Sequence, residues 1–73
     1  MDKHTFISIW GNRAQLAAAI GEGESTVRNW FNRNSIPTKY DQKLMDAAKG
    51  KGHDLTPTQL FEVRQSMTKE ATL

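Results

Sequence analysis

The short turn Gly21-Glu22-Gly23 is the feature that most constrains the fold of this chain. Residues 13–20 before it have apolar residues at helical spacing, and the resulting face consists of Leu16, Ala17 and Ile20. Gly21 can adopt the left-handed conformation that ends a helix, and Gly23 is acceptable as the N-cap of the next helix. Two helices joined by so few residues must pack on each other at a large crossing angle.

The segment after the turn predicts a second helix, over about residues 24–33. Its apolar positions follow the i, i+3, i+4 spacing of an amphipathic helix and are Val27, Trp30 and Phe31. Glu24 falls in the first turn, where a negative charge is favourable beside the positive end of the helix dipole. Asn34 can provide a left-handed stop, and Ile36-Pro37 takes the chain out of helical conformation.

Two more helices are predicted on either side of this pair. The first covers residues 3–10, where apolar residues again recur at helical spacing. The other spans about residues 38–49, with Thr38 as its N-cap and Asp41 three residues later in a weak form of the capping box. Each has a glycine directly after its end, which favours termination there.

The fifth helix has the best-specified start in the chain. Thr56 is its N-cap, Pro57 occupies the first helical position, and Gln59 completes a capping box. The apolar spacing continues to about Met67, where we expect the helix to end. Residues 68–73 have little to bury and are predicted to form a flexible tail.

These signals predict a single compact all-α domain of five helices over residues 1–67. The chain has no cysteine, which excludes a disulfide framework and a thiolate zinc site. Its longest apolar stretch, Leu16 to Ile20, is far shorter than the roughly 20 residues of a membrane span. We therefore expect a soluble intracellular protein that does not contact a membrane.

The charge of the chain is unevenly distributed, although its net charge is only +2. Residues 12–52 contain seven Lys and Arg and four Asp and Glu, which is +3, whereas residues 53–73 come to −1. A local excess of positive charge is typical of a nucleic-acid surface, but an ordinary solvated surface explains it equally well.

The stretch NRAQLAAAIGEGESTVRNW, residues 12–30, resembles the helix-turn-helix of Cro and lambda-repressor-like phage regulators. The matching positions are Leu16-Ala17, Ile20-Gly21, Val27 and Trp30. The chain departs from the family pattern in the turn, where Glu22 replaces an apolar residue and Gly23 replaces a serine or threonine cap. The resemblance implies a lambda-repressor-like fold and a regulator that binds double-stranded DNA, usually as a two-fold dimer on a palindromic operator.

The polar side of the helix at residues 24–33 is suited to reading bases in the major groove. Arginine pairs with guanine, asparagine with adenine, serine with either base, and glutamate accepts from cytosine. The predicted base-reading residues are Glu24, Ser25, Arg28, Asn29 and Asn32. A solvated helix face is the alternative, but such faces are rich in Lys and Glu, and this one has no lysine.

Contacts to DNA phosphates are expected from the rim of that face. Arginine at the start of the helix at residues 13–20 stands where backbone N–H groups already favour an anion. The predicted phosphate-binding residues are Arg13, Gln15, Thr26, Arg33, Lys39 and Lys43. For each lysine singly, an ordinary solvated charge is the alternative.

The dimer surface is predicted on the fifth helix. Phe61 lies off the apolar stripe formed by Leu60, Val63 and Met67, so it is available for a partner chain. The alternative is that Phe61 completes the core of its own chain.

No pattern in the chain predicts an enzyme, a cofactor, a metal ion or a small-molecule substrate. His4 and His53 lack spaced metal-ligand partners, and the serines have no neighbouring base pattern. Two other functions stay open: a protein-interaction factor, such as an antirepressor or host-takeover module, and a small DNA-bending or excision protein. The acidic pair of Glu22 and Glu24 favours the first of these. Glu22 either faces water or repels phosphates and so lowers non-specific binding.

Overall fold

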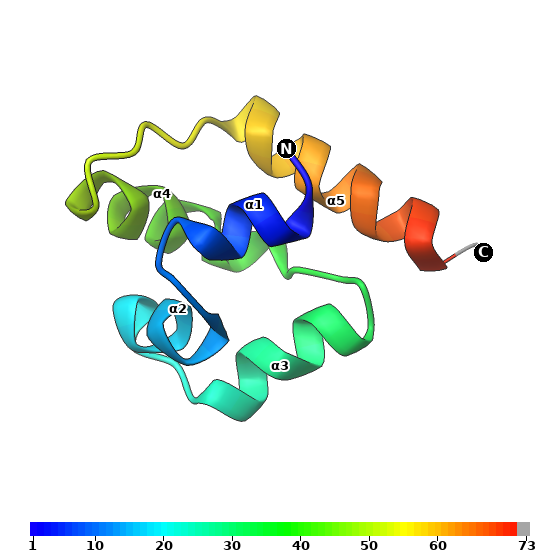
Figure 1. The fold of residues 1–73 in the computed structure, drawn as a ribbon, viewed down its shortest axis with the longest axis horizontal. Helices are drawn as coiled ribbons and strands as arrows, with labels where there is room; N and C mark the ends of the chain where they lie inside the picture. The colour runs from blue at the N-terminus through cyan, green and yellow to red at the C-terminus, as the bar shows by residue number, and fades with distance from the viewer. Residues whose placement is uncertain (72–73) are drawn as a thin grey trace.

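The computed structural model describes residues 1–71, with side chains as far as Thr68. Within these residues it contains five α-helices, one 3-10 helix and no strand, which confirms the predicted all-α class (Figure 1). In chain order the elements are α1 (Lys3–Ser8), α2 (Arg13–Ile20), α3 (Glu24–Asn32), the 3-10 helix η1 (Thr38–Tyr40), α4 (Asp41–Gly50) and α5 (Pro57–Ala71).

Helix α2 begins and ends where its local sequence predicts. The side chain of Asn12 accepts a hydrogen bond of 2.8 Å from the backbone N–H of Gln15, which caps the start. At the other end Gly21 is left-handed with φ of 74°, and the N–H of Glu22 donates to the carbonyl of Ala17 at 2.9 Å. The three-residue turn therefore rests on backbone geometry that glycine supplies at no steric cost.

The predicted capping box of α5 is also present. The hydroxyl of Thr56 accepts from the N–H of Gln59 at 3.1 Å, and the N–H of Thr56 donates to the Gln59 side chain at 3.2 Å. The helix continues to Ala71, so the predicted end near Met67 is wrong. Residues 68–71 contain no helix breaker, and residues 72–73 of the predicted tail lie outside the described part of the chain.

Helix α1 is shorter than predicted, because it ends at Ser8 and not at Trp10. The N–H groups of Ile9 and Trp10 donate to carbonyls three residues earlier, at 3.2 and 3.1 Å, so the chain tightens after Ser8. Trp10 is nevertheless buried, and its ring meets Phe6 edge-on with centroids 5.2 Å apart. Trp10 thus keeps its predicted place in the core although it lies outside the helix.

The predicted start at Thr38 is wrong as well. Residues 38–40 form η1, whose N-cap is Pro37, and the N-cap of α4 is Tyr40; neither makes a side-chain capping hydrogen bond. Asp41, predicted to complete a capping box, instead pairs with Arg64 of α5. Arg64 also donates to the carbonyl of Ile36 at 3.1 Å and to that of Pro37 at 3.5 Å. A distant side chain, and not a local cap, therefore fixes the chain between α3 and α4.

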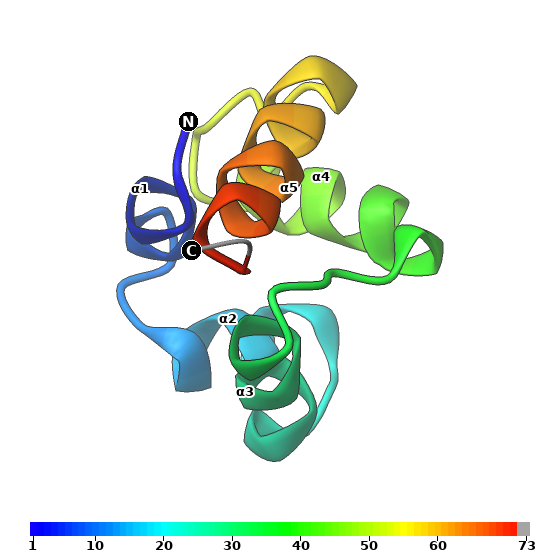
Figure 2. The same ribbon diagram turned by 90° about the vertical axis from the view of Figure 1, so that its right-hand side faces the viewer.

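All five helices contribute to one hydrophobic core. The side chains that are fully buried in it are Phe6, Leu16, Val27, Leu44, Leu60, Val63 and Met67. Helix α2 packs against α3 and α4, and α1 packs against α5. Helix α2 is seen nearly end-on in Figure 1, whereas α3 is seen nearly end-on in Figure 2, so their axes cross at a wide angle. In the described residues no helix is both long and apolar enough to cross a lipid bilayer.

Candidate nucleic-acid interface

Helix α3 divides cleanly into a buried side and an exposed side. Val27, Trp30 and Phe31 lie in the core, as the spacing predicts. The opposite side is solvent-exposed and carries the residues that we call the reading face: Glu24, Ser25, Arg28, Asn29 and Asn32. All five predicted base-reading side chains are therefore accessible together along one helix. Thr26 beside them is half-buried.

Two members of the reading face are joined to each other. The guanidinium of Arg28 donates to the carboxylate of Glu24 at 2.7 Å, and both side chains are about half exposed, at 55% and 52%. The pair lines a surface hollow of about 350 Å³ together with the first residues of α2, Asn12 to Ala14. Arg13, predicted to bind phosphate, thus lies beside the start of α3.

A cluster that no sequence pattern predicted surrounds Tyr40, which is almost completely buried. Its hydroxyl donates to the carboxylate of Glu22 at 2.9 Å, and its ring lies 4.8 Å from that of Trp30 between centroids. The ammonium groups of Lys39 and Lys43 lie 5.3 and 5.7 Å from the centre of the same ring. These distances are within reach of cation–π attraction. We call these five residues the Tyr40 cluster.

The Tyr40 cluster accounts for Glu22, which the sequence left open between a solvated residue and one that repels phosphates. The hydrogen bond to Glu22 raises the pKa of the Tyr40 phenol above its ordinary value, and burial and the carboxylate charge act in the same direction. Glu22 is a partner of Tyr40, which lies 18 residues away. No local sequence signal could have paired these two residues.

The remaining predicted phosphate-binding residues come from several elements, and among them Lys39 and Lys43 meet over the Tyr40 ring. Arg33 is exposed at the end of α3, and Lys39 and Lys43 are exposed in η1 and α4. Gln15 is exposed too, but its side chain lies over Gly11, where an added Cβ would be 2.1 Å from the Gln15 amide oxygen. Gln15 therefore faces the start of α2 and is the least well placed of the set.

Phe61 is the one large apolar side chain that the described residues leave exposed, at 59%. The alternative that it completes the core is therefore wrong for the single chain. Helix α5 lies on the side of the molecule away from α2 and α3 (Figure 1). A surface hollow of about 370 Å³ adjoins Phe61 and is lined also by Arg64, Gln65 and Thr68.

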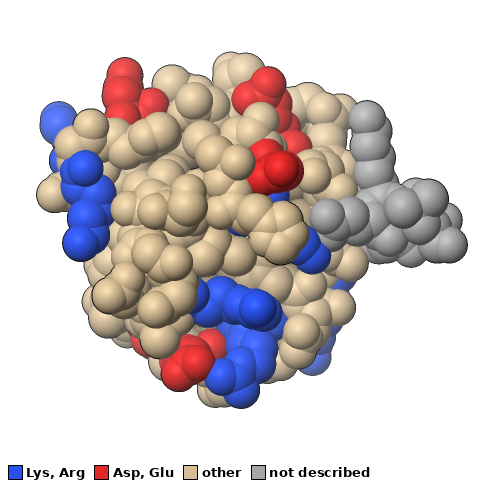
Figure 3. All heavy atoms as spheres, viewed as in Figure 1, with Lys and Arg blue, Asp and Glu red and all other residues tan. Residues whose placement is uncertain are grey.

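Basic and acidic side chains gather at different places on the face that Figure 3 shows. Lys and Arg cluster on its lower part, where α3 begins, and an acidic group lies beside them. The upper edge, near α5 and the segment that leads into it, carries mainly acidic groups. The uneven charge seen along the sequence is thus also uneven in space.

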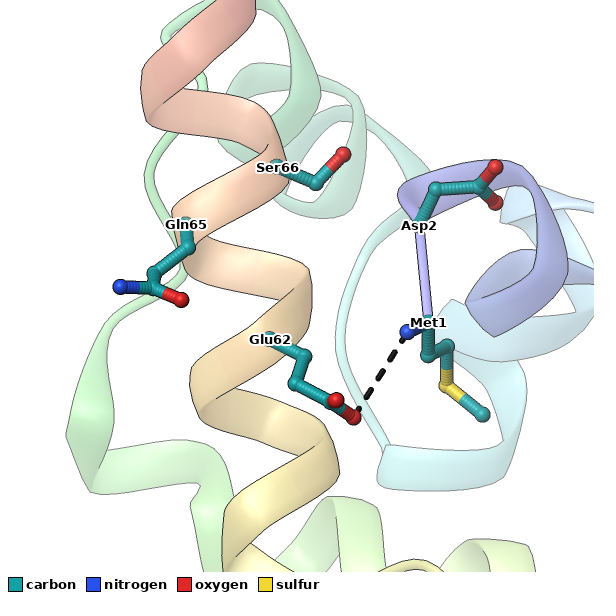
Figure 4. Close-up of a pocket in the computed structure, with 5 residues that line it drawn as sticks. All are labelled: Met1, Asp2, Glu62, Gln65 and Ser66. Atoms are coloured by element: carbon teal, nitrogen blue, oxygen red, sulfur yellow. Dashed lines mark ion pairs between the residues drawn. The ribbon is translucent and has the colours of Figure 1, made fainter.

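A third hollow lies at the start of α1, far from the reading face in the sequence. It measures about 290 Å³ and is lined by Met1, Asp2, Glu62, Gln65 and Ser66 (Figure 4). The N-terminal ammonium group lies 3.6 Å from the Glu62 carboxylate. The carboxylate of Asp2 caps α1 by accepting a hydrogen bond from the backbone N–H of Thr5, and this bond lowers the pKa of that carboxyl. Among the described residues no three His, Asp or Glu side chains group as a metal site would require.

Comparisons of the chain with protein-family models, with curated proteins and with solved structures gave no match. The candidate site therefore rests on the residues on and around α3. These residues combine an exposed face of arginine and amide side chains with basic residues before and after the helix.

Proposed function

We propose that this chain is a sequence-specific regulator that binds double-stranded DNA, of the Cro-like phage or prophage type, and that α3 enters the major groove. The observation that carries the proposal is the reading face. It lies on the second helix of a pair that crosses at a wide angle after a three-residue turn. An α-helix fits the major groove, where each base pair presents a distinct pattern of donors and acceptors.

The chemistry of the reading face suits G·C and A·T pairs alike. Arg28 can donate to guanine while Asn29 and Asn32 offer paired donors and acceptors to adenine. The bond to Glu24 occupies one Nη group of Arg28 and leaves its other N–H groups for a base. Because this bond already orders the Arg28 side chain, less conformational entropy is lost when the side chain binds DNA.

Phosphate contacts are proposed on both sides of α3. Arg13 lies beside the start of the helix, next to the hollow that Arg28 lines. Lys39 and Lys43 follow the end of the helix and are exposed. Thr26, Arg33 and Gln15 complete the proposed set, with Gln15 contributing least because of its position over Gly11. Contacts on both sides would fix the orientation of α3 in the groove.

A homodimer on a palindromic operator belongs to the same proposal. One copy of α3 reaches only one half-site, and two-fold dimers place two such helices about one helical turn apart. The exposed ring of Phe61 supports a contact through α5, which leaves α3 free for DNA. Such a regulator would act in the bacterial cytoplasm, where the operator is.

The acidic pair no longer favours a protein-interaction factor. Glu22 has Tyr40 as its partner and Glu24 has Arg28, so both carboxylates have roles inside the chain. No contact in the described residues specifically favours a DNA-bending protein either. The DNA-binding regulator is therefore the function that we propose.

Selection of bound sites from random duplex DNA tests the proposal directly. We expect the wild-type chain to enrich a palindrome. Arg28→Ala and Asn29→Ala should each weaken binding to that site by about 1–3 kcal/mol and relax the preference at one base pair. Ser8→Ala on α1 is an exposed control away from α3 and from Phe61, and it should bind as the wild type does. Recovery of no enriched sequence by the wild-type chain would refute sequence-specific binding.

A further inference from the structure

We propose that Tyr40 is a positioning residue for the DNA backbone: held by Glu22, its ring directs Lys39 and Lys43 toward one phosphate-binding surface beyond the end of α3. The inference rests on the proposed function and goes beyond it, because it assigns a role to two residues that contact no DNA themselves. It also makes Lys39 and Lys43 a pair, whereas singly each is an ordinary solvated charge.

The first support is that the ring of Tyr40 has little freedom to move. It is 9% exposed and packs against Trp30, which belongs to the buried side of α3. Its hydroxyl is bonded to Glu22, in the turn before α3. A single side chain therefore joins the segment that enters α3 to the segment that leaves it. Side chains that lie over this ring are therefore held at a fixed position relative to the reading face.

The second support is that both lysines lie over this fixed ring. Their ammonium groups lie 5.3 and 5.7 Å from the centre of the ring, within the range of about 6 Å for a cation–π interaction. A lysine side chain loses much rotamer entropy when it is ordered, so a ring that orders two of them in advance removes part of that cost from binding. An ammonium group on a ring face keeps N–H donors for a phosphate oxygen.

The third support is the charge of Glu22. Two ammonium groups near one ring repel each other, and a carboxylate bonded to the ring's hydroxyl offsets part of that repulsion. The hydrogen bond to a charged acceptor is also stronger than one between neutral groups. Glu22 therefore stabilises the arrangement without occupying either lysine.

A double-mutant cycle tests the inference, with binding to a random-sequence DNA duplex measured over a series of salt concentrations. The combined Lys39→Ala/Lys43→Ala variant should flatten the slope of log K against log salt by about 1.8, since each phosphate contact contributes about 0.9. Tyr40→Leu should weaken binding several-fold in the wild-type background and have no effect in the lysine-free background. Such coupling is what a residue acting through the lysines produces.

Tyr40→Phe is the conservative variant, because it keeps the ring and the core packing and removes only the bond to Glu22. We expect a smaller loss of binding than for Tyr40→Leu, and again none without the lysines. It also decides the matter if Tyr40→Leu does not fold, as checked by circular dichroism.

The outcomes separate this inference from the proposed function. Equal loss from the Tyr40 substitutions with and without the lysines overturns the positioning role, because Tyr40 then acts only on the fold. Wild-type binding by Tyr40→Phe overturns the role of the Glu22 bond. If the wild-type chain binds no duplex even at low salt, the proposed function itself fails.

Discussion

The segments that enter and leave α3 are held in different ways. The entering turn, residues 21–23, depends on the left-handed backbone of Gly21 and on hydrogen bonds between near neighbours. The leaving segment, residues 33–40, begins with a predicted local stop, because Asn34 is left-handed with φ of 53° and the N–H of Ser35 donates to the carbonyl of Trp30 at 2.8 Å. The rest of this segment is held by Arg64 and Glu22, which come from elsewhere in the chain. Local left-handed residues thus adjoin both ends of the proposed reading helix, and the segment after it also has backbone carbonyls bound by a distant side chain, Arg64. Three substitutions, each with a matched control, test this difference.

The largest effect is expected at Arg64, which serves the leaving segment. Arg64→Met removes the ion pair with Asp41 and the bonds to the carbonyls of Ile36 and Pro37. The ion pair of Arg64 and Asp41 is only partly buried. We therefore expect a loss of about 2 kcal/mol in the free energy of unfolding, which is less than breaking a fully buried pair costs. Urea denaturation measures this loss.

Arg33→Met is the matched control for that experiment, since Arg33 is an exposed arginine at the end of α3. It should change the stability by less than about 0.5 kcal/mol, as surface substitutions usually do. Equal losses for the two variants would show that the leaving segment does not depend on Arg64.

A smaller effect is expected in the entering turn. Gly21→Ala places a Cβ at φ of 74°, although nothing lies within 4 Å of the new atom. The cost is then that of the left-handed backbone alone, about 1–2 kcal/mol. Gly50→Ala is the same substitution in α4 at ordinary helical φ, and it should leave stability unchanged or raise it slightly. Thermal unfolding of both variants compares them, and destabilisation of both to the same extent would contradict the local account.

The smallest effect concerns the proton of Tyr40, which is the only tyrosine in the chain. Its absorbance change on ionisation therefore reports one group. We expect the phenol pKa to lie above its ordinary value of about 10, because its hydroxyl donates to Glu22. Since the folded-state pKa is raised, the linked stability is fully present below the unfolded value and is lost as the pH rises through the folded value.

Two substitutions sharpen that titration. Glu22→Ala should lower the phenol pKa toward its ordinary value, because it removes both the acceptor and the charge. Glu24→Ala, two residues away and bonded to Arg28, should leave the titration unchanged. If Glu22→Ala leaves it unchanged as well, the two segments are not joined through this hydrogen bond.

The parts of the fold that the sequence predicted correctly are those with local causes. The cap by Asn12, the left-handed Gly21 and the capping box of Thr56 and Gln59 each involve residues within a few positions of one another. The exposed reading face follows in the same way, because helical spacing alone assigns Val27 and Trp30 to the core. The start of α4 was predicted wrongly because the distant side chain of Arg64 takes Asp41 from the predicted capping box. The early end of α1 coincides with local hydrogen bonds to carbonyls three residues earlier, which apolar spacing does not predict.

The sequence by itself determined that α2 and α3 form with a glycine turn between them and that one side of α3 stays polar. Only the tertiary structure decided the roles of Glu22, Tyr40, Asp41 and Arg64. Glu22 and Tyr40 are 18 positions apart in the sequence, and Asp41 and Arg64 are 23 positions apart. No periodicity or capping rule links residues at such separations. Whether two distant polar side chains meet depends on how the helices pack, and helix packing depends on the shape of the whole core.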